Sequence, residues 1–320
     1  MQEVELLGET SKWRAREVKY IAGSWSQISK NIPSFELKDF SEGKGEIVNQ
    51  YYKTVVRLPL TPLENRIPVG IVSNAYTLAQ HSIVANLCIE GIKNCGIVTD
   101  SVRCELGLSV LGEWMNFRIY FPDEYDFKSS DSNPLKLRLE CFNSVDGSSR
   151  LTILFGWFRL VCSNGMVIGK TISELRDIHN RHMDLEKINS LISEAMHQVH
   201  SDKEMMTEWE KNKINTTALA DWVDATVSKK WGKIAAFRVF HICSSGHDAK
   251  YSDPFEVEKP SCKSMIQLSE VPGAPNEARN LYDVGQALSW VATNRNNAEE
   301  KTKWQTEIPN LLEKLVLATA

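Results

Sequence analysis

No apolar run in the 320-residue sequence approaches the roughly 20 consecutive residues that an α-helix needs to cross a bilayer. The first 20 residues, MQEVELLGETSKWRAREVKY, also lack the basic segment followed by an apolar one that marks a secretory signal. We therefore expect no membrane segment and a cytoplasmic location.

Paired cysteine motifs are missing too. The seven cysteines are scattered, odd in number and without CxxC spacing. This pattern is typical of reduced thiols in a cytosolic protein and not of a disulfide framework. Cys88 and Cys95 come nearest to a zinc-binding pair, but they are too far apart in sequence and lack a second pair. The cysteines therefore predict no metal site.

The sequence also lacks a surplus of basic residues. Its formal net charge is −4 with a pI near 6.0. Acidic residues slightly outnumber basic ones both up to residue 150 (19 against 17) and after it (22 against 20). Proteins that bind duplex nucleic acid usually neutralise phosphates with clustered Lys and Arg. The composition, 42% hydrophobic and 24% charged, is typical of a globular protein with a large core.

The part of the sequence from residue 47 to residue 170 carries the signals of an antiparallel, hairpin-rich sheet. Runs of β-branched and aromatic residues predict strands at 47–60, 67–78, 102–111, 114–121, 135–142 and 151–155. Gly112-Glu113 and Asp146-Gly147 lie between such runs and predict turns. Residues 82–94 are the exception, because their apolar residues recur at helical spacing and Ser82 is placed to cap a helix.

The hydrophobic period changes to 3.6 after Thr171, which predicts a helical C-terminal half. Apolar residues from Leu185 to Val199 form one stripe, and Thr171 or Ser173 can cap the start of a long helix. Further helices are predicted from Thr217, at 277–294 and at 298–316, whereas turn formers at 243–262 predict a long loop.

These patterns predict an α+β fold with a hairpin-rich antiparallel sheet in the N-terminal half and a helical C-terminal half. We expect three segments: a sheet domain with one early helix (1–170), a long helix with a helical hairpin (171–242), and an irregular linker with C-terminal helices (243–320).

The stretch NGMVIGKT, residues 164–171, resembles the loop with which many ATPases bind phosphate. That loop needs four residues between its first glycine and the Gly-Lys-Thr, and here only residues 166–168 intervene. A shorter loop cannot wrap a phosphate with the same backbone amides. Asn164-Gly165 is a strong hairpin signal, because both residues tolerate positive φ. We predict a β-hairpin and no nucleotide cofactor.

Several groups of polar residues have the composition of catalytic or metal sites. They are the histidine pairs His179/His182 and His197/His200, the acids Asp123/Glu124/Asp126 and Asp221/Asp224, and the thiol of Cys162 with His81 as its base. The two histidine pairs lie roughly 22 Å apart along one predicted helix, so they cannot share an ion. Because no accompanying ligand or catalytic motif is identifiable, we predict no catalytic residue and no metal.

The aromatic stretch FGWFR, residues 155–159, is interpreted in two ways. Alternation along a strand places Phe155, Trp157 and Arg159 on one face, which suits either a sheet core or a platform for a protein or for single-stranded bases. The stretch KWRAREVKY, residues 12–20, is both basic and aromatic. The candidate partner-binding residues are Trp157, Phe158, Arg159, Asn164, Gly165, Trp13, Arg14 and Arg16.

The run LRLECFNSVDGSSRLTILFGWFRLVCSNGMVIGK resembles the phage- and plasmid-encoded family known as domain of unknown function 932, with its pattern NSxDGS followed by FRLVCSNG. PVGIVSNAYTLAQH upstream and NLYDVGQALSWVATN downstream are also similar to the family, although Gly285, Ser289 and Asn294 depart from its polar pattern. The resemblance covers roughly residues 67–315. It implies a mobile genetic element in the cytoplasm of a bacterial host, and it carries over no catalytic residue.

Three functions of different classes remain open. We favour a non-enzymatic, homo-oligomeric protein that antagonises a host (defence) protein complex, given the acidic balance, the nine tryptophans and the lack of a coherent active site. The alternative is a single-strand DNA-binding or annealing protein in phage or plasmid recombination, using the stretches 12–20 and 155–159. The third hypothesis is a metal-dependent nuclease built on the histidine helix and an acidic loop.

Overall fold

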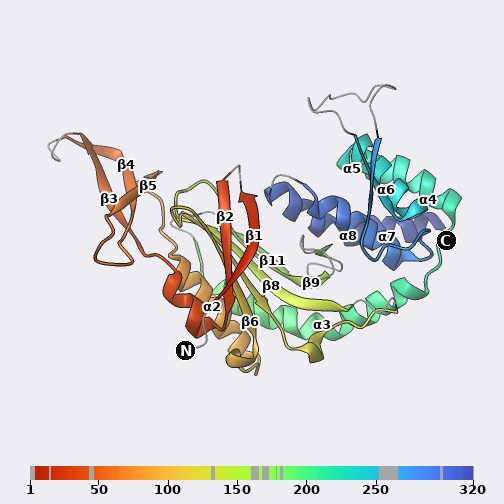
Figure 1. Cartoon of the computed structure of the whole chain (residues 1–320), viewed down its shortest axis with the longest axis horizontal. Coiled ribbons are helices and arrows are strands. Elements are labelled where there is room, and N and C mark those ends of the chain that lie inside the picture. Colours follow the sequence, from red (N-terminus) through yellow and green to blue (C-terminus); the bar gives the residue numbers. More distant parts are fainter. Residues whose placement is uncertain are drawn as a thin grey trace. The chain divides into compact units, whose positions relative to one another are not determined.

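A computed structural model describes residues 4–13, 16–42, 47–130, 134–159, 166–167, 173–177, 179–180, 183–251, 266–295 and 298–319 (Figure 1). The chain forms an α+β fold, with antiparallel sheets in the N-terminal half and helices in the C-terminal half. It divides into two compact units that are not consecutive in sequence. Unit 1 comprises residues 1–126, 137–156 and 171–199, and unit 2 comprises residues 127–136, 157–170 and 200–320.

The largest element is an eight-stranded sheet in the order β1-β2-β6-β7-β8-β9-β10, with β11 also pairing with β9. Its strands are β1 (Glu5–Trp13), β2 (Arg16–Gly23), β6 (Arg103–Ser109), β7 (Trp114–Tyr120), β8 (Leu135–Ser144), β9 (Leu151–Arg159), β10 (Met166–Val167) and β11 (Ser173–Asp177). Every pair whose register is defined is antiparallel. Such sheets are built from local hairpins, as the closely spaced turn signals of the sequence predict.

One face of this sheet forms the apolar core of unit 1. Met115, Phe117 and Ile119 alternate along β7 and are fully buried. Helix α1 (Trp25–Ile28) packs Trp25 against Phe117, with ring centroids 5.2 Å apart. Helix α2 (His81–Asn94) covers the same face, where the thiol of Cys88 contacts that of Cys141. Short 3₁₀ turns lie at Ser29–Asn31, Thr99–Ser101 and Asp123–Tyr125.

The opposite face carries a buried network of charged and aromatic residues. Glu140 accepts hydrogen bonds from Arg118 Nε at 3.0 Å, from Arg138 Nη2 and from Asn116 Nδ2 at 2.9 Å. Burial raises the pKa of Glu140, but the two arginines and the hydrogen bonds outweigh burial and lower it to about 2. Arg118 also lies 4.6 Å above the ring of Tyr20. The carboxylate therefore balances two guanidinium groups inside unit 1.

A second sheet of unit 1, which we call the β-arm, contains β3 (Phe35–Glu42), β4 (Ile47–Arg57) and β5 (Ile67–Ser73) in the order β3-β4-β5. At its base, Phe35, Val55 and Val72 form a core with Val145, which lies just after β8. Gly70 lies against the backbone of Asp146, where a Cβ atom would come within 2.8 Å of the Asp146 Cα. The β-arm is thus attached to the eight-stranded sheet through residues 145 and 146.

Unit 2 consists mainly of helices. They are α3 (Lys187–Lys211, shared with unit 1), α4 (Thr216–Trp222), the π-helix η4 (Val223–Val227), α5 (Ser228–Trp231), α6 (Lys233–Ser245), α7 (Leu281–Thr293) and α8 (Ala298–Thr319). Strands β12 (His247–Tyr251) and β13 (Ile266–Glu270) pair beside them. The fully buried Asp248 accepts from Arg238 at 2.6 and 2.7 Å and from Trp290 Nε1 at 2.9 Å. Within the described ranges, no helix has the length and apolarity to cross a membrane.

Several sequence predictions are confirmed, among them the hairpin around Gly112 and the Asp146-Gly147 turn, in which Gly147 has φ 76°. The helix predicted from Thr171 is wrong at its start. Residues 173–177 form a strand because they pair with β9, and the helix begins at Lys187. The long loop predicted at 243–262 is also wrong at its start, where residues 247–251 form β12. Ser82 does not cap α2, whose N-cap is Gln80.

The Glu140 network generates a stability prediction. Glu140→Gln removes the negative charge that the buried guanidinium groups of Arg118 and Arg138 share. We therefore expect the free energy of unfolding at pH 7 to fall by about 3 kcal/mol. Because its pKa is lowered from 4.5 to about 2, Glu140 stabilises the wild type above pH 4.5, and this contribution is lost as the pH falls towards 2. Urea unfolding from pH 7 to pH 3 measures both effects. The exposed Glu90→Gln in α2 is the matched control, and equal midpoints for the two variants would contradict the prediction.

Candidate protein-binding surface

Exposed apolar and aromatic side chains are concentrated on the β-arm and its connecting loop. They are Phe40, Ile47, Val48, Tyr51, Tyr52, Leu60, Leu63 and Ile71. Scattered exposed apolar residues are normal, but several of them gathered on one small sheet are typical of an interaction surface. We therefore treat the β-arm as the candidate site.

The most exposed tyrosines lie in a bulge of β4. Asp39 pairs with Lys53 and Ser41 pairs with Val48, so that β3 has a single residue, Phe40, opposite residues 49–52 of β4. We call residues 49–52 the tyrosine bulge. Its two tyrosines are prominent: Tyr51 is 74% exposed and Tyr52 48%. A bulge redirects side chains that a regular strand would align with its neighbours.

Two asparagines hold the tyrosine bulge in place. Asn49 Oδ1 accepts hydrogen bonds from the backbone N–H of Tyr51 at 2.8 Å and of Tyr52 at 3.2 Å. From the end of β5, Asn74 donates its backbone N–H to the Tyr51 carbonyl at 2.9 Å and its side-chain amide to the Gln50 carbonyl. The backbone that carries the tyrosines is therefore ordered before any partner arrives, which lowers the entropic cost of binding.

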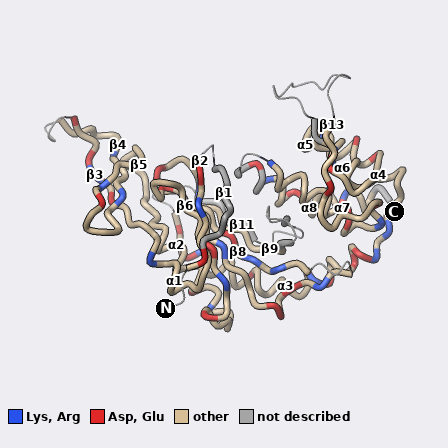
Figure 2. Tube along the Cα trace, viewed as in Figure 1, with Lys and Arg blue, Asp and Glu red and all other residues tan. Residues whose placement is uncertain are grey.

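The β-arm has no net charge. Residues 35–73 contain five basic and five acidic side chains. Figure 2 shows both signs interspersed along the described part of this segment. Arg57 pairs with Glu64 at 2.6 Å, and Glu36 pairs with Arg66 at 2.6 Å and with Lys38 at 3.4 Å. Backbone and Arg57 hydrogen bonds lower the pKa of Glu64, so that this carboxylate stays ionised. The surface therefore offers aromatic contact area without an electrostatic attraction for phosphates.

Behind the base of the β-arm, buried polar groups fix the residues around the β8–β9 turn. His81 Nε2 lies 3.0 Å from the Gly112 carbonyl, and its Nδ1 lies 2.9 Å from the Asn143 side-chain amide. Tyr76 donates to the Ser144 carbonyl at 3.2 Å, and its ring stacks on His179. Burial lowers the pKa of His81 to about 4, so this imidazole is neutral at pH 7 and closed off from solvent. These contacts position the turn and do not present a base to a substrate.

The residues predicted from the sequence to bind a partner lie elsewhere. Trp157 is fully buried, and the ammonium of Lys203 lies 5.5 Å from its ring centroid, so its interpretation as an exposed platform is wrong. For Phe158, Arg159, Trp13 and Arg16 the structure describes only the backbone, in β9, β1 and β2. Arg14, Asn164 and Gly165 lie outside the described residues, although the pairing of β10 with the end of β9 is the one that a hairpin requires.

Among the described residues, the polar groups with the composition of metal sites are not brought together. His179 lies outside any helix, against Tyr76, while His197 and His200 belong to α3, and His182 and Cys162 lie outside the described residues. The acids at 123–126 follow β7, whereas Asp221 and Asp224 lie in α4 and η4. In the part of the chain that the structure describes, no three His, Cys, Asp or Glu residues are grouped as metal ligands.

Sequence reasoning missed the tyrosine bulge. The run 47–60 was correctly predicted as a strand, but Asn49-Gln50 inside it carried a usable signal, because Asn is disfavoured in strands and often bonds to the backbone amides that follow it.

One family model matches the chain. It is described as Domain of unknown function (DUF932) and covers residues 68–306. No curated protein and no solved structure is similar enough to the chain to count as a match. The matched region begins inside β5, so the tyrosine bulge precedes it.

The hydrogen bonds that the Asn49 side chain accepts in the tyrosine bulge generate a prediction about local order. Asn49→Ala removes the side-chain acceptor of two backbone amides, so we expect hydrogen exchange at Tyr51 and Tyr52 to accelerate about tenfold, the equivalent of one modest hydrogen bond. Asn49→Asp keeps the acceptor and should retain slow exchange. Mass spectrometry of peptides covering residues 47–57 measures the exchange rate. An unchanged rate in Asn49→Ala would show that the Asn49 hydrogen bonds do not order the tyrosine bulge.

His81 generates a prediction about pH. Its pKa falls from 6.5 in the unfolded chain to about 4 in the folded one, so its neutral form stabilises the fold above pH 6.5. This contribution, about 3 kcal/mol, is lost as the pH falls from 6.5 towards 4. The unfolding free energy of His81→Gln should depend less on pH over this range than that of the wild type. Parallel urea-unfolding curves at pH 7 and pH 4.5 measure the difference, and identical pH dependence would refute the assignment.

Proposed function

The chain belongs to the DUF932 family, and on that premise we propose that it is a non-enzymatic binding protein whose tyrosine bulge docks on the surface of another protein. We propose that the partner is the one expected from the sequence, a protein complex of a bacterial host. A homo-oligomer of the chain would bind this complex in the cytoplasm and antagonise it. The family description assigns no reaction, so the proposal depends on the chain's own residues.

One observation supports the proposal above all others: two adjacent, exposed tyrosines stand on a backbone held by Asn49 and Asn74. Tyrosine is enriched among the residues that contribute most to the affinity of protein interfaces. Its side chain offers a large ring with few rotatable bonds, and its hydroxyl can form a hydrogen bond at the edge of the interface. Phe40, Ile47 and Val48 are also exposed and lie near the bulge in the ladder of β3 and β4.

The single-strand DNA alternative was predicted from residues 12–20 and 155–159. The tyrosines of the bulge could also serve it, because exposed aromatic rings can stack on bases. Such binding normally requires positive charge along the nucleotide backbone, and the β-arm carries equal numbers of basic and acidic residues. Protein docking needs no such surplus, which is why we favour it. The metal-dependent nuclease remains a hypothesis.

The prediction concerns the double variant Tyr51→Ser/Tyr52→Ser. Interface tyrosines typically contribute about 2 kcal/mol or more when truncated, so we expect affinity for the partner to fall at least about 30-fold. The partner is recovered by affinity capture from nuclease-treated lysate of bacterial cells, using immobilised wild type and variants, and its affinity is then measured with purified protein. The matched control is Val98→Ser/Val110→Ser, which removes two apolar side chains that are each 68% exposed and lie outside the β-arm and its connecting loop.

Two further measurements separate the alternatives. Filter binding of a single-stranded oligonucleotide across a range of salt concentrations tests the DNA hypothesis; tight, salt-sensitive binding that the tyrosine variant loses would replace our proposal with it. Light scattering measures the oligomeric state, and a monomer at all concentrations would remove the oligomer from the proposal. Capture of the same partners by the wild type and the tyrosine variant would rule out the tyrosine bulge as the docking site.

A further inference from the structure

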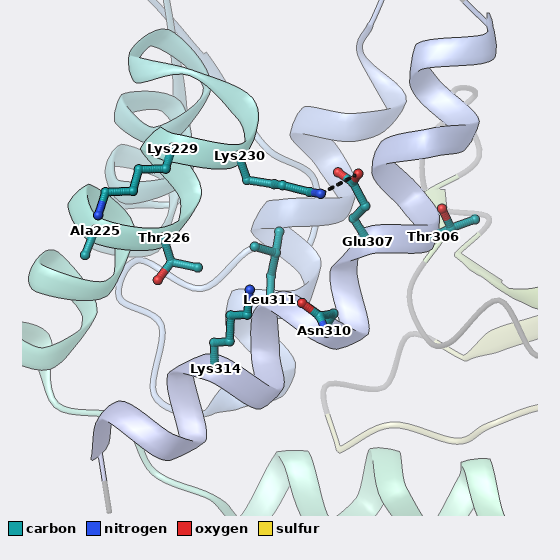
Figure 3. A pocket seen from close by; sticks show the side chains of 9 residues that line it. All are labelled: Ala225, Thr226, Lys229, Lys230, Thr306, Glu307, Asn310, Leu311 and Lys314. Carbon is teal, nitrogen blue, oxygen red and sulfur yellow. Dashed lines mark ion pairs between the residues drawn. The ribbon is translucent and has the colours of Figure 1, made fainter.

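A pocket of about 530 Å³ lies in unit 2, between the interrupted helix of η4 and α5 on one side and α8 on the other. We call it the lysine pocket (Figure 3). Its lining residues are Ala225, Thr226, Lys229, Lys230, Thr306, Glu307, Asn310, Leu311 and Lys314. The buried Leu311 provides an apolar floor, and polar groups from both walls surround it. The volume is within the range of small-molecule sites.

Both walls of the lysine pocket are irregular helices. Ala225 and Thr226 belong to η4, where the Ser228 N–H bonds to the Val223 carbonyl in the i→i−5 pattern of a π-helix. On the facing wall, Pro309 lies inside α8 and removes one backbone hydrogen bond beside Asn310 and Leu311. Single-turn π-helices cost stability and occur frequently at functional sites. The π-helix and the internal proline thus border the same pocket from opposite sides.

Tryptophans hold the two walls at a set distance. Trp222 donates its indole N–H to the Leu311 carbonyl at 3.1 Å, and Trp231 donates to Glu307 Oε2 at 2.8 Å. Trp231 also stacks on Trp304 of α8, with ring centroids 4.6 Å apart. These cross-wall contacts come from positions on either side of Thr226. The lysine pocket is therefore preorganised, which favours binding.

The charge in the lysine pocket is mostly positive. Lys230 pairs with Glu307 at 3.2 Å, as the dashed line in Figure 3 shows. Lys229 and Lys314 have no ion-pair partner within the residues that the structure describes. Three ammonium groups against one carboxylate leave two positive charges in excess. Lys229 and Lys314 are exposed at the pocket, and their excess positive charge makes an anion the favoured occupant.

We propose that the lysine pocket binds the phosphate group of a small phosphorylated molecule, such as a nucleoside monophosphate. A phosphate dianion accepts hydrogen bonds from several directions, which suits ammonium groups and hydroxyls placed on two facing walls. Carboxylates are typically bound by the planar fork of arginine, and none of the pocket's described lining residues is an arginine. Leu311 and Ala225 give the organic part of the ligand an apolar surface.

Isothermal titration calorimetry with the full-length protein tests the proposal, using inorganic phosphate, adenosine 5′-monophosphate and adenosine as probes. We expect both phosphate-bearing probes to bind and adenosine not to bind. Lys229→Ala/Lys314→Ala should weaken binding about tenfold or more, since it removes two charged hydrogen-bond donors. The matched control Lys233→Ala/Lys213→Ala removes the same charge from exposed positions of unit 2 outside the pocket and should bind as the wild type does.

A variant that is expected to bind more tightly separates a loss of binding from a loss of folding. Glu307→Gln removes the only carboxylate among the described residues that line the pocket, keeps a side-chain oxygen for Trp231, and releases Lys230 to the ligand. We expect it to bind phosphate about threefold more tightly or better. Absence of binding by either phosphate probe at millimolar concentration, equal binding of adenosine, or undiminished binding by the double lysine variant would each overturn the proposal. None of these outcomes bears on the tyrosine bulge.

Discussion

The turn between β8 and β9 is the constraint on which unit 1 depends. Val145 completes the core at the base of the β-arm, while Asp146 accepts hydrogen bonds from the indole N–H of Trp114 and from the backbone N–H of Ser148. Gly147 adopts φ 76°, which a residue with a side chain rarely does, and lies against Val72 of β5. A single tight turn therefore joins two sheets that share no strand.

The candidate surfaces of both units arise where a regular element is interrupted and then fixed by polar side chains. In the β-arm, a bulge exposes two tyrosines, and Asn49 satisfies the amides that the ladder loses. In unit 2, a π-helix and an internal proline border the lysine pocket, and indole N–H groups join the walls. Each interruption costs stability, and the side-chain hydrogen bonds offset part of that cost. Interruptions of this kind place side chains where regular backbone geometry does not.

Local patterns were good guides wherever a segment's neighbours in space are also its neighbours in sequence. The hairpin of β6 and β7, helix α2 and the two last helices were predictable, because turn residues and hydrophobic period act over short distances. The start of the long helix was not, since residues 173–177 have a helical pattern but pair with a strand 18 to 26 residues upstream. The candidate site was missed for a related reason. The sequence pattern suggested that Trp157 binds a partner, but packing against distant segments buries this side chain.

The sequence by itself determined the α+β class, the hairpin-rich sheet, the turn at Asp146-Gly147 and the family resemblance. Turn residues and the hydrophobic period are local properties, so they can be recognised without knowledge of the tertiary structure. Only the tertiary structure decided which aromatic residues are exposed and which charges share a pocket. Lys229 and Lys314 are far apart in sequence and line one pocket from two helices. Tyr51 reaches solvent through a bulge whose register β3 and β5 define. Exposure and proximity depend on packing between distant segments, which local propensity does not encode.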